Sequence, residues 1–115
     1  RDPHPLSSAH LCRYARRTTP DVEQAAGLFK VLASPVRVAA LLRMADGPVG
    51  VGDLADHVGV THTLMSQHLR VLRMSGLVRS EHEGRSRAYS LTDDHVAHIV
   101  RDAVQHAAEE APHDR

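Results

Sequence analysis

The chain has 115 residues, which is long enough for one domain with a modest core. Its formal net charge is zero, so bulk charge alone does not mark it as a nucleic-acid-binding protein. Hydrophobic residues make up 42% of the chain and aromatic residues only 3%, which predicts a helical core of Leu, Val, Ala and Met. Cys12 is the single cysteine, which excludes an intrachain disulfide, a CxxC motif and a dithiol switch.

The hydropathy pattern argues against a membrane protein. No apolar run approaches the roughly 20 residues of a membrane span, and the N-terminal residues lack the hydrophobic region of a signal peptide. We therefore expect a cytoplasmic protein without a membrane partner.

Charge is unevenly distributed along the chain. Between Thr61 and Ser90 there are five arginines and two glutamates, a net charge of +3, whereas residues 91–115 contain six acids and two arginines, a net charge of −4. A basic segment followed by an acidic one indicates that the two regions meet different partners.

Residues 1–20 mix Pro, Ser, His and Arg without lasting periodicity, so we interpret them as a flexible tail with a short helical piece around residues 9–16. Residues 21–111 are expected to form the folded domain. Its first helix begins after Pro20 with Asp21 as N-cap. The apolar residues of this helix recur at i, i+3, i+4 and i+7: Ala25, Leu28, Phe29 and Leu32.

A second helix is predicted from Ser34-Pro35 to Gly47-Pro48. We expect it to bury Val36, Val38, Ala39, Leu41 and Leu42. A short helix over residues 51–58 follows, and a turn containing Gly59 leads into a helix over residues 62–75 that Thr61 caps and Gly76 ends. Two short helices joined by a glycine-containing turn predict a helix-turn-helix.

Two strands, over residues 77–80 and 87–91, are joined by the polar loop EHEGRS and predict a hairpin with Arg at its tip. Thr92 or Asp93 then caps a last helix, residues 92–110, which ends before Pro112. The expected fold is mainly α with a small β-hairpin, a winged helix-turn-helix that forms a homodimer through its terminal helices.

The second helix of the helix-turn-helix carries exposed polar residues near its N-terminal end. In this motif such positions face the major groove of double-stranded DNA, where Gln pairs with adenine and Arg with guanine or phosphate. The candidate DNA-binding residues are Thr61, His62, Thr63, Ser66, Gln67, Arg70 and, on the hairpin, Arg85 and Arg87. A solvated polar face is the alternative for any one of them, but the combination favours DNA. His68 has two interpretations, a buried packing residue beside Leu69 or a base reader, and we do not assign it as a ligand.

Asp93, His95, His106 and Glu109 form a spaced set of metal-type ligands on the last helix. His95 and His106 are eleven residues apart. They therefore share a helical face but lie about 16 Å apart along the axis, too far for one metal ion. Two copies of the helix packed antiparallel bring opposite ends together. The spacing thus predicts a symmetric dimer with two metal sites between the subunits.

Three motifs make the chain resemble the ArsR/SmtB family of winged-helix metal-sensing repressors: LASPVRVAALL, SQHLRVLRMSGLV and GRSRAYSL. The likeness covers roughly residues 22–110. It implies a homodimer that binds operator DNA and releases it when an inducer binds. The family's thiol-rich site needs cysteines in the segment GVGDLADHVGV, which has none, so an arsenite or cadmium/lead thiolate sensor of that type is excluded.

The resemblance also implies a ligand set. Asp93 and His95 of one protomer would join His106 and Glu109 of the other around Zn(II), and the second ring N–H of His106 would donate to the Gly76 carbonyl. One alternative is a Ni(II) or Co(II) sensor that draws extra ligands from His4, His10, Cys12 or His113. Another is a winged-helix DNA-binding module with no metal. We expect no enzyme, because no nucleophile–base pair or phosphate-binding loop is present.

Overall fold

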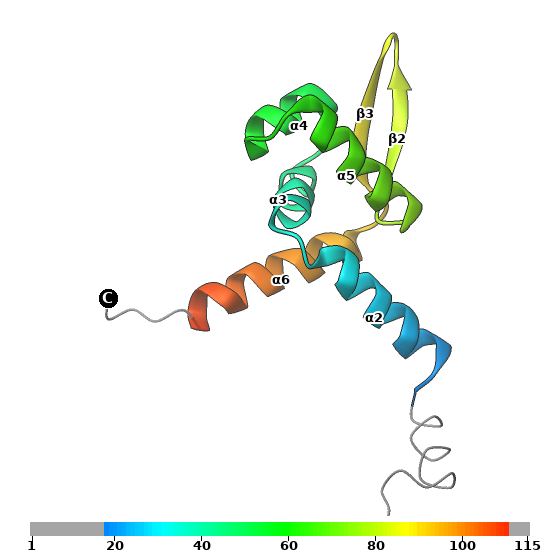
Figure 1. The fold of residues 1–115 in the computed structure, drawn as a ribbon, viewed down its shortest axis with the longest axis vertical. Coiled ribbons are helices and arrows are strands. Elements are labelled where there is room, and N and C mark those ends of the chain that lie inside the picture. The colour runs from blue at the N-terminus through cyan, green and yellow to red at the C-terminus, as the bar shows by residue number, and fades with distance from the viewer. Residues whose placement is uncertain (1–17, 111–115) are drawn as a thin grey trace, which may run out of the picture. The chain divides into compact units, whose positions relative to one another are not determined.

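The computed structural model describes residues 18–110, which form five helices and three strands (Figure 1). In chain order these are α2 (Pro20–Leu32), α3 (Pro35–Met44), β1 (Val49–Gly50), α4 (Val51–Val58), α5 (His62–Met74), β2 (Val78–Glu83), β3 (Ser86–Leu91) and α6 (Asp94–Glu110). The helical piece expected around residues 9–16 lies outside the described residues. Within 18–110 no single helix is long and apolar enough to cross a membrane; α2 and α3 meet that test only when joined across their break.

Helix α2 begins at Pro20, and its N-cap is Thr19 rather than the expected Asp21. The Thr19 hydroxyl accepts the Val22 N–H at 3.2 Å, and the Thr19 carbonyl accepts the Glu23 N–H at 2.9 Å. Proline suits the first helical position because it has no N–H to leave unpaired. No residue of α2 is buried, and Val22 and Phe29 are exposed.

Helix α3 begins where expected, because the Ser34 hydroxyl accepts the Arg37 N–H at 3.3 Å. Its buried residues are Ala40, Leu41 and Met44. The predicted burial is therefore correct only for Leu41; the other four predicted residues, Val36, Val38, Ala39 and Leu42, are only half-buried. Periodicity identifies an apolar stripe on a helix, but the neighbouring elements decide which edge of that stripe is fully covered.

The helix-turn-helix is confirmed. Gly59 ends α4 in the left-handed region (φ +89°), and the N–H groups of Gly59 and Val60 both donate to the Ala55 carbonyl, at 2.8 and 3.0 Å. Glycine adopts this conformation without the steric penalty that a Cβ atom imposes. Thr61 then caps α5, as predicted, by accepting the Leu64 N–H at 3.1 Å.

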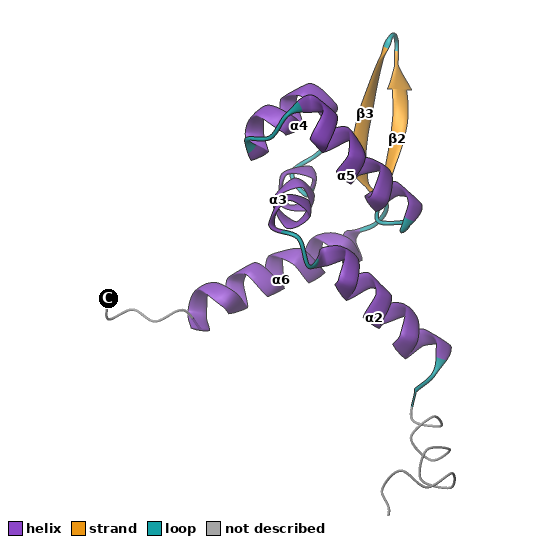
Figure 2. Ribbon diagram, viewed as in Figure 1, coloured by secondary structure: helices purple, strands orange, loops and turns teal. Residues whose placement is uncertain are grey.

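The three strands form one antiparallel sheet in the order β1-β3-β2. Strand β1, which the sequence did not predict, pairs Val49 with Tyr89. Strands β2 and β3 pair from Val78 opposite Leu91 out to Glu83 opposite Ser86, so most of the expected loop EHEGRS is strand. Figure 2 shows this hairpin extending beyond α4 and α5 as a wing.

The core is aliphatic, as composition predicted, with no buried polar or charged side chain among the described residues. Its largest fully buried side chains are Leu41, Leu54, Met65, Leu69, Leu72 and Val100. Helix α6 joins this core through Val96, Ala97 and Val100. Of its two predicted caps, Asp93 takes the role: its Oδ1 accepts the Val96 N–H at 3.2 Å.

Candidate nucleic-acid interface and metal centre

One concave surface is lined, among the described residues, by side chains of α5. Its lining residues are His62, Thr63, Ser66, Gln67, Arg70, Arg73 and Met74, all exposed. The opposite side of the helix buries Met65, Leu69 and Leu72, which fixes the direction in which the polar side faces. Five of the seven lining residues are those singled out from the sequence. Arg73 and Met74 were missed, although a continuation of the same helical face by one turn reaches both.

The cations on this surface are available for binding. Arg70 and Arg73 make no hydrogen bond or ion pair with other residues of the described range 18–110. Thr61 differs, because its oxygen already accepts the Leu64 N–H as the cap of α5. A hydroxyl can still donate its proton while it accepts, so this cap leaves Thr61 able to bind an anion.

The wing carries a second group of polar side chains. The Arg87 guanidinium donates to the Ser80 hydroxyl at 3.0 Å and lies 2.9 Å from His82 Nε2. Arginine has only donors, so His82 Nε2 is the acceptor in this pair. Ser80 and His82 were not found from the sequence, because only the register that places His82 opposite Arg87 brings them together. Arg85 is exposed at the turn, beside Gly84.

His68 lies on α5 but belongs to neither surface. Its Nδ1 accepts a hydrogen bond from Arg37 Nε of α3 at 3.0 Å, and its side chain is half-buried. Burial, and secondly the Arg37 charge, lower the pKa of His68 below its ordinary value of 6.5. Of the two interpretations of His68, the contact with α3 favours a packing role, although the side chain is half-buried rather than buried.

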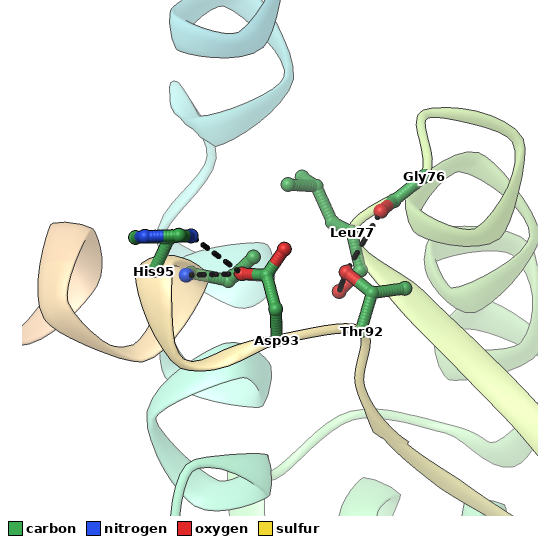
Figure 3. Close-up of polar contacts among 6 residues, drawn as sticks. Gly76, Leu77, Thr92, Asp93 and His95 are labelled. Atoms are coloured by element: carbon green, nitrogen blue, oxygen red, sulfur yellow. Dashed lines mark hydrogen bonds and ion pairs between the residues drawn. The ribbon is translucent and has the colours of Figure 1, made fainter.

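The metal-type residues lie at the two ends of α6. Asp93 and His95 are close together at its start, with 3.7 Å between Asp93 Oδ1 and His95 Nδ1 (Figure 3). The His95 side chain is 90% exposed and that of Asp93 55% exposed. His106 and Glu109 are both exposed near the other end, where Glu109 accepts a hydrogen bond from Gln105 Nε2 at 3.2 Å.

The ligand face of α6 is turned away from the core. At about 100° per residue, His95, His106 and Glu109 fall within a sector of roughly 60°, whereas Val96, Ala97 and Val100 centre on the opposite side. Within residues 18–110, no three His, Cys, Asp or Glu side chains come together in a way that could hold a metal ion. One chain therefore brings together Asp93 and His95 but does not join them to His106 and Glu109.

A comparison with protein families matches residues 34–80 to the bacterial regulatory proteins of the arsR family. The HTH-type transcriptional repressor SmtB of Mycobacterium tuberculosis is 45% identical over 92 residues, which cover 79% of this chain and 68% of that protein. The chain belongs to the ArsR/SmtB family. The HTH-type transcriptional regulator NmtR of the same organism is 42% identical, over 73% of this chain and 70% of its own length.

Solved structures of other transcriptional regulators share the fold. The homodimeric winged helix-turn-helix DNA-binding domain Mb0332 of Mycobacterium bovis aligns with a TM-score of 0.72 and 29% identity, over 82% of this chain and 87% of that one. The transcriptional repressor BigR of Xylella fastidiosa aligns with a TM-score of 0.67 and 30% identity, over 81% and 93%. ArsR/SmtB proteins are DNA-binding transcriptional regulators, which confirms the winged-helix fold and the expectation that this chain is not an enzyme.

Proposed function

We propose that this ArsR/SmtB protein is a homodimeric repressor that binds operator DNA and releases it when Zn(II) binds between the subunits. The observation that carries the proposal is the placement of His95, His106 and Glu109 on one exposed face of α6, opposite its buried face. A face directed away from its own core can complete a coordination shell only with a second molecule. Asp93 and His95 of one protomer would then join His106 and Glu109 of the other.

The donor set fits zinc. Two imidazoles and two carboxylates are a usual ligand set for a four-coordinate Zn²⁺. With Zn–N and Zn–O bonds near 2 Å, neighbouring donor atoms of a tetrahedral site are about 3.4 Å apart. Asp93 Oδ1 lies 3.7 Å from His95 Nδ1, so the two side chains are near enough to contribute to one metal site. Asp93 also keeps its second carboxylate oxygen free of the helix cap, because only Oδ1 accepts the Val96 N–H.

Exposed apolar residues support the dimer. Val104 is 39% exposed and Ala103 and Ala107 are also exposed, although they continue the apolar side of α6 beyond the core. Helix α2 adds exposed Val22 and Phe29. A second copy would cover the exposed apolar residues of α6, and the similar Mb0332 domain is homodimeric.

The surface on α5 supports DNA binding. Gln67 and Arg70 lie on the side of α5 that faces away from the core, as residues that read base edges in the major groove must. The uncommitted cations Arg70 and Arg73 suit phosphate contacts, and Arg85 and Arg87 would place the wing on the flanking backbone. We assign Thr61, His62, Thr63 and Ser66 to the same interface.

When bound, zinc supplies a cross-link between the two last helices. In the dimer, the two chains would respond by changing the relative placement of their α5 helices, the recognition helices that contact DNA. Zinc can shift the equilibrium between the two arrangements only if it binds one of them more tightly than the other. Coupling of this kind is typically about 1–3 kcal/mol, which corresponds to a 5- to 150-fold change in operator affinity.

The test uses His106→Ala, with His98→Ala as the matched control, because His98 is an exposed histidine of the same helix outside the ligand set. Both variants should bind operator DNA without metal as the parent chain does. His106→Ala should lose zinc binding and zinc-dependent release, whereas His98→Ala should keep both. Normal release by His106→Ala would overturn the proposal.

Absorption spectra of the cobalt-substituted chain should show four-coordinate metal, whereas a higher coordination number would favour the Ni(II)/Co(II) alternative.

A further inference from the structure

The end of α5, the recognition helix, is hydrogen-bonded to Thr92, the residue directly before the N-cap of α6. Thr92 lies between the last residue of β3, Leu91, and Asp93, the N-cap of α6. Its hydroxyl donates to the Gly76 carbonyl at 2.9 Å (Figure 3), and its N–H donates to the Leu77 carbonyl at 3.1 Å. The segment that contains Asp93 and His95 is therefore bound on its N-terminal side to the residues that end α5.

The acceptor of that hydroxyl is itself fixed. Gly76 adopts the left-handed region (φ +77°), its N–H donates to the Arg73 carbonyl at 3.0 Å, and the Leu77 N–H donates to the Leu72 carbonyl at 3.0 Å. These two bonds form the Schellman motif that ends a helix. Any displacement of the Gly76 carbonyl is therefore passed to the last turn of α5, which carries Arg73 of the concave surface.

The hydroxyl contact is directed mainly at Gly76. The Thr92 oxygen is also 3.2 Å from the Leu77 carbonyl, but a hydroxyl has one proton, and Leu77 already accepts the Thr92 N–H. The Gly76 carbonyl oxygen has a second lone pair, so this bond leaves room for the expected donation from a partner's His106.

We propose that Thr92 is a positioning residue that transmits the metal-bound state of Asp93 and His95 to the recognition helix of the same chain. This inference rests on the proposed function, since it takes Asp93 as a ligand. A carboxylate held on a metal between two subunits fixes the position of residue 93. Thr92 is covalently joined to Asp93 and hydrogen-bonded to the end of α5. Fixing the position of Asp93 therefore also fixes the position of the end of α5.

The test compares three variants of the full chain. Thr92→Val removes the hydroxyl and keeps a β-branched side chain, and Thr92→Ser restores the hydroxyl. Ser75→Ala is the matched control, because Ser75 Oγ also donates to a carbonyl at the end of α5, that of Val71 at 2.8 Å, but this bond stays within the helix.

The first measurement is amide hydrogen exchange without metal. Thr92→Val should exchange the Gly76 and Leu77 amides about 3- to 10-fold faster, the effect of losing one neutral hydrogen bond. The second measurement is the ratio of operator affinities without and with zinc. Thr92→Val should bind zinc like the parent chain but show a ratio lower by about the same factor. Thr92→Ser should restore both values, and Ser75→Ala should leave the ratio unchanged.

The outcomes separate the two proposals. If the parent chain binds zinc and releases DNA, and Thr92→Val has the same affinity ratio, the Thr92 inference is wrong and the proposed function stands. An equal loss of the ratio in Ser75→Ala would also overturn the inference, because any weakening of the helix end would then suffice. If the parent chain binds no zinc, the proposed function is overturned together with the role of Thr92 in transmitting it.

Discussion

Arg37 of α3 donates from Nε to Nδ1 of His68 on the recognition helix at 3.0 Å, and its Nη1 donates to the Val31 carbonyl at 3.2 Å. This bond requires His68 to be neutral, because a protonated imidazole has no acceptor and would repel the guanidinium. The pKa of His68 is accordingly lowered, first by burial and then by the Arg37 charge. Helices α3 and α5 are thus joined by a polar contact that depends on pH.

The first prediction concerns stability in mild acid. Unfolded His68 takes up a proton near pH 6.5. Folded His68 resists protonation, so the unfolded state binds more protons just below that pH and the free energy of unfolding falls as pH decreases. This contribution is fully present above pH 6.5 and is lost below it. His68→Gln keeps an acceptor for Arg37 without titrating, so its unfolding free energy should fall less than that of the parent chain.

Urea unfolding between pH 7.5 and 5 measures this difference. The control is His62→Gln, because His62 is an exposed histidine on the same helix. His62→Gln should follow the pH dependence of the parent chain. The same pH dependence in His68→Gln as in the parent chain would show that the Arg37–His68 contact does not limit stability in acid.

The second prediction concerns the uncommitted cations of α5. Arg73→Ala should weaken operator binding across different DNA sequences and reduce the slope of log affinity against log salt by about 1, because one phosphate contact is lost. Arg101→Ala is the control, since Arg101 lies on α6 and contacts the Ala45 carbonyl at 3.2 Å. Binding isotherms at several salt concentrations give both slopes. An unchanged slope for Arg73→Ala would remove Arg73 from the interface.

The third prediction separates the two sides of α5. Leu72 is fully buried and Met74 is 76% exposed on the concave surface. Leu72→Ala should lower the free energy of unfolding by about 2–5 kcal/mol, because it removes buried methyl groups and leaves a cavity. Met74→Ala should change it by less than about 0.5 kcal/mol. Thermal and urea unfolding measure both values, and a large loss in Met74→Ala would mean that this side chain packs against something in solution.

The sequence predicted those features that depend on local patterns. Thr61, Ser34 and Gly59 act where capping and turn rules place them, and the metal-type residues were recognised by their spacing along one helix. Strand β1 was missed because a strand of two residues is too short to show alternating hydropathy. It is defined only by its pairing with β3. The wing strands were predicted too short because Glu81, His82 and Glu83 are polar and were read as part of the loop, although backbone pairing extends through them.

The contacts that join distant segments were beyond sequence reasoning. Arg37 and His68 are 31 residues apart, and Thr92 and Gly76 are 16 apart. Each of these residues could form hydrogen bonds with many partners. The packing of α3 on α5 brings Arg37 to His68, and the register of β2 on β3 brings Thr92 to Gly76. His82 became visible as a partner of Arg87 for the same reason.

The fourth prediction tests how the wing holds Arg87. Its guanidinium is directed by Ser80 and His82, so its position on the hairpin is fixed before DNA arrives. Arg87→Ala should weaken operator binding more than His82→Ala, which keeps the cation but removes one of its two partners. A double-mutant cycle measures the coupling between them, expected to be about 0.5–1 kcal/mol for an exposed pair of this kind. Additive effects of the two substitutions would show that His82 does not position Arg87.

The last prediction concerns the dimer. Val104 is 39% exposed on the apolar side of α6, beyond the residues that reach the core. Val104→Glu places a charge where a second copy is proposed to cover the helix, and an unpaired charge is strongly unfavourable in an apolar interface. His98→Glu adds the same charge on the polar side of α6 and serves as the control. Sedimentation velocity should show that Val104→Glu is monomeric and His98→Glu dimeric. Because the proposed zinc site draws ligands from two chains, a monomeric Val104→Glu chain should also lose high-affinity zinc binding. Zinc binding by that monomer with parental affinity would instead require all the ligands to come from one chain.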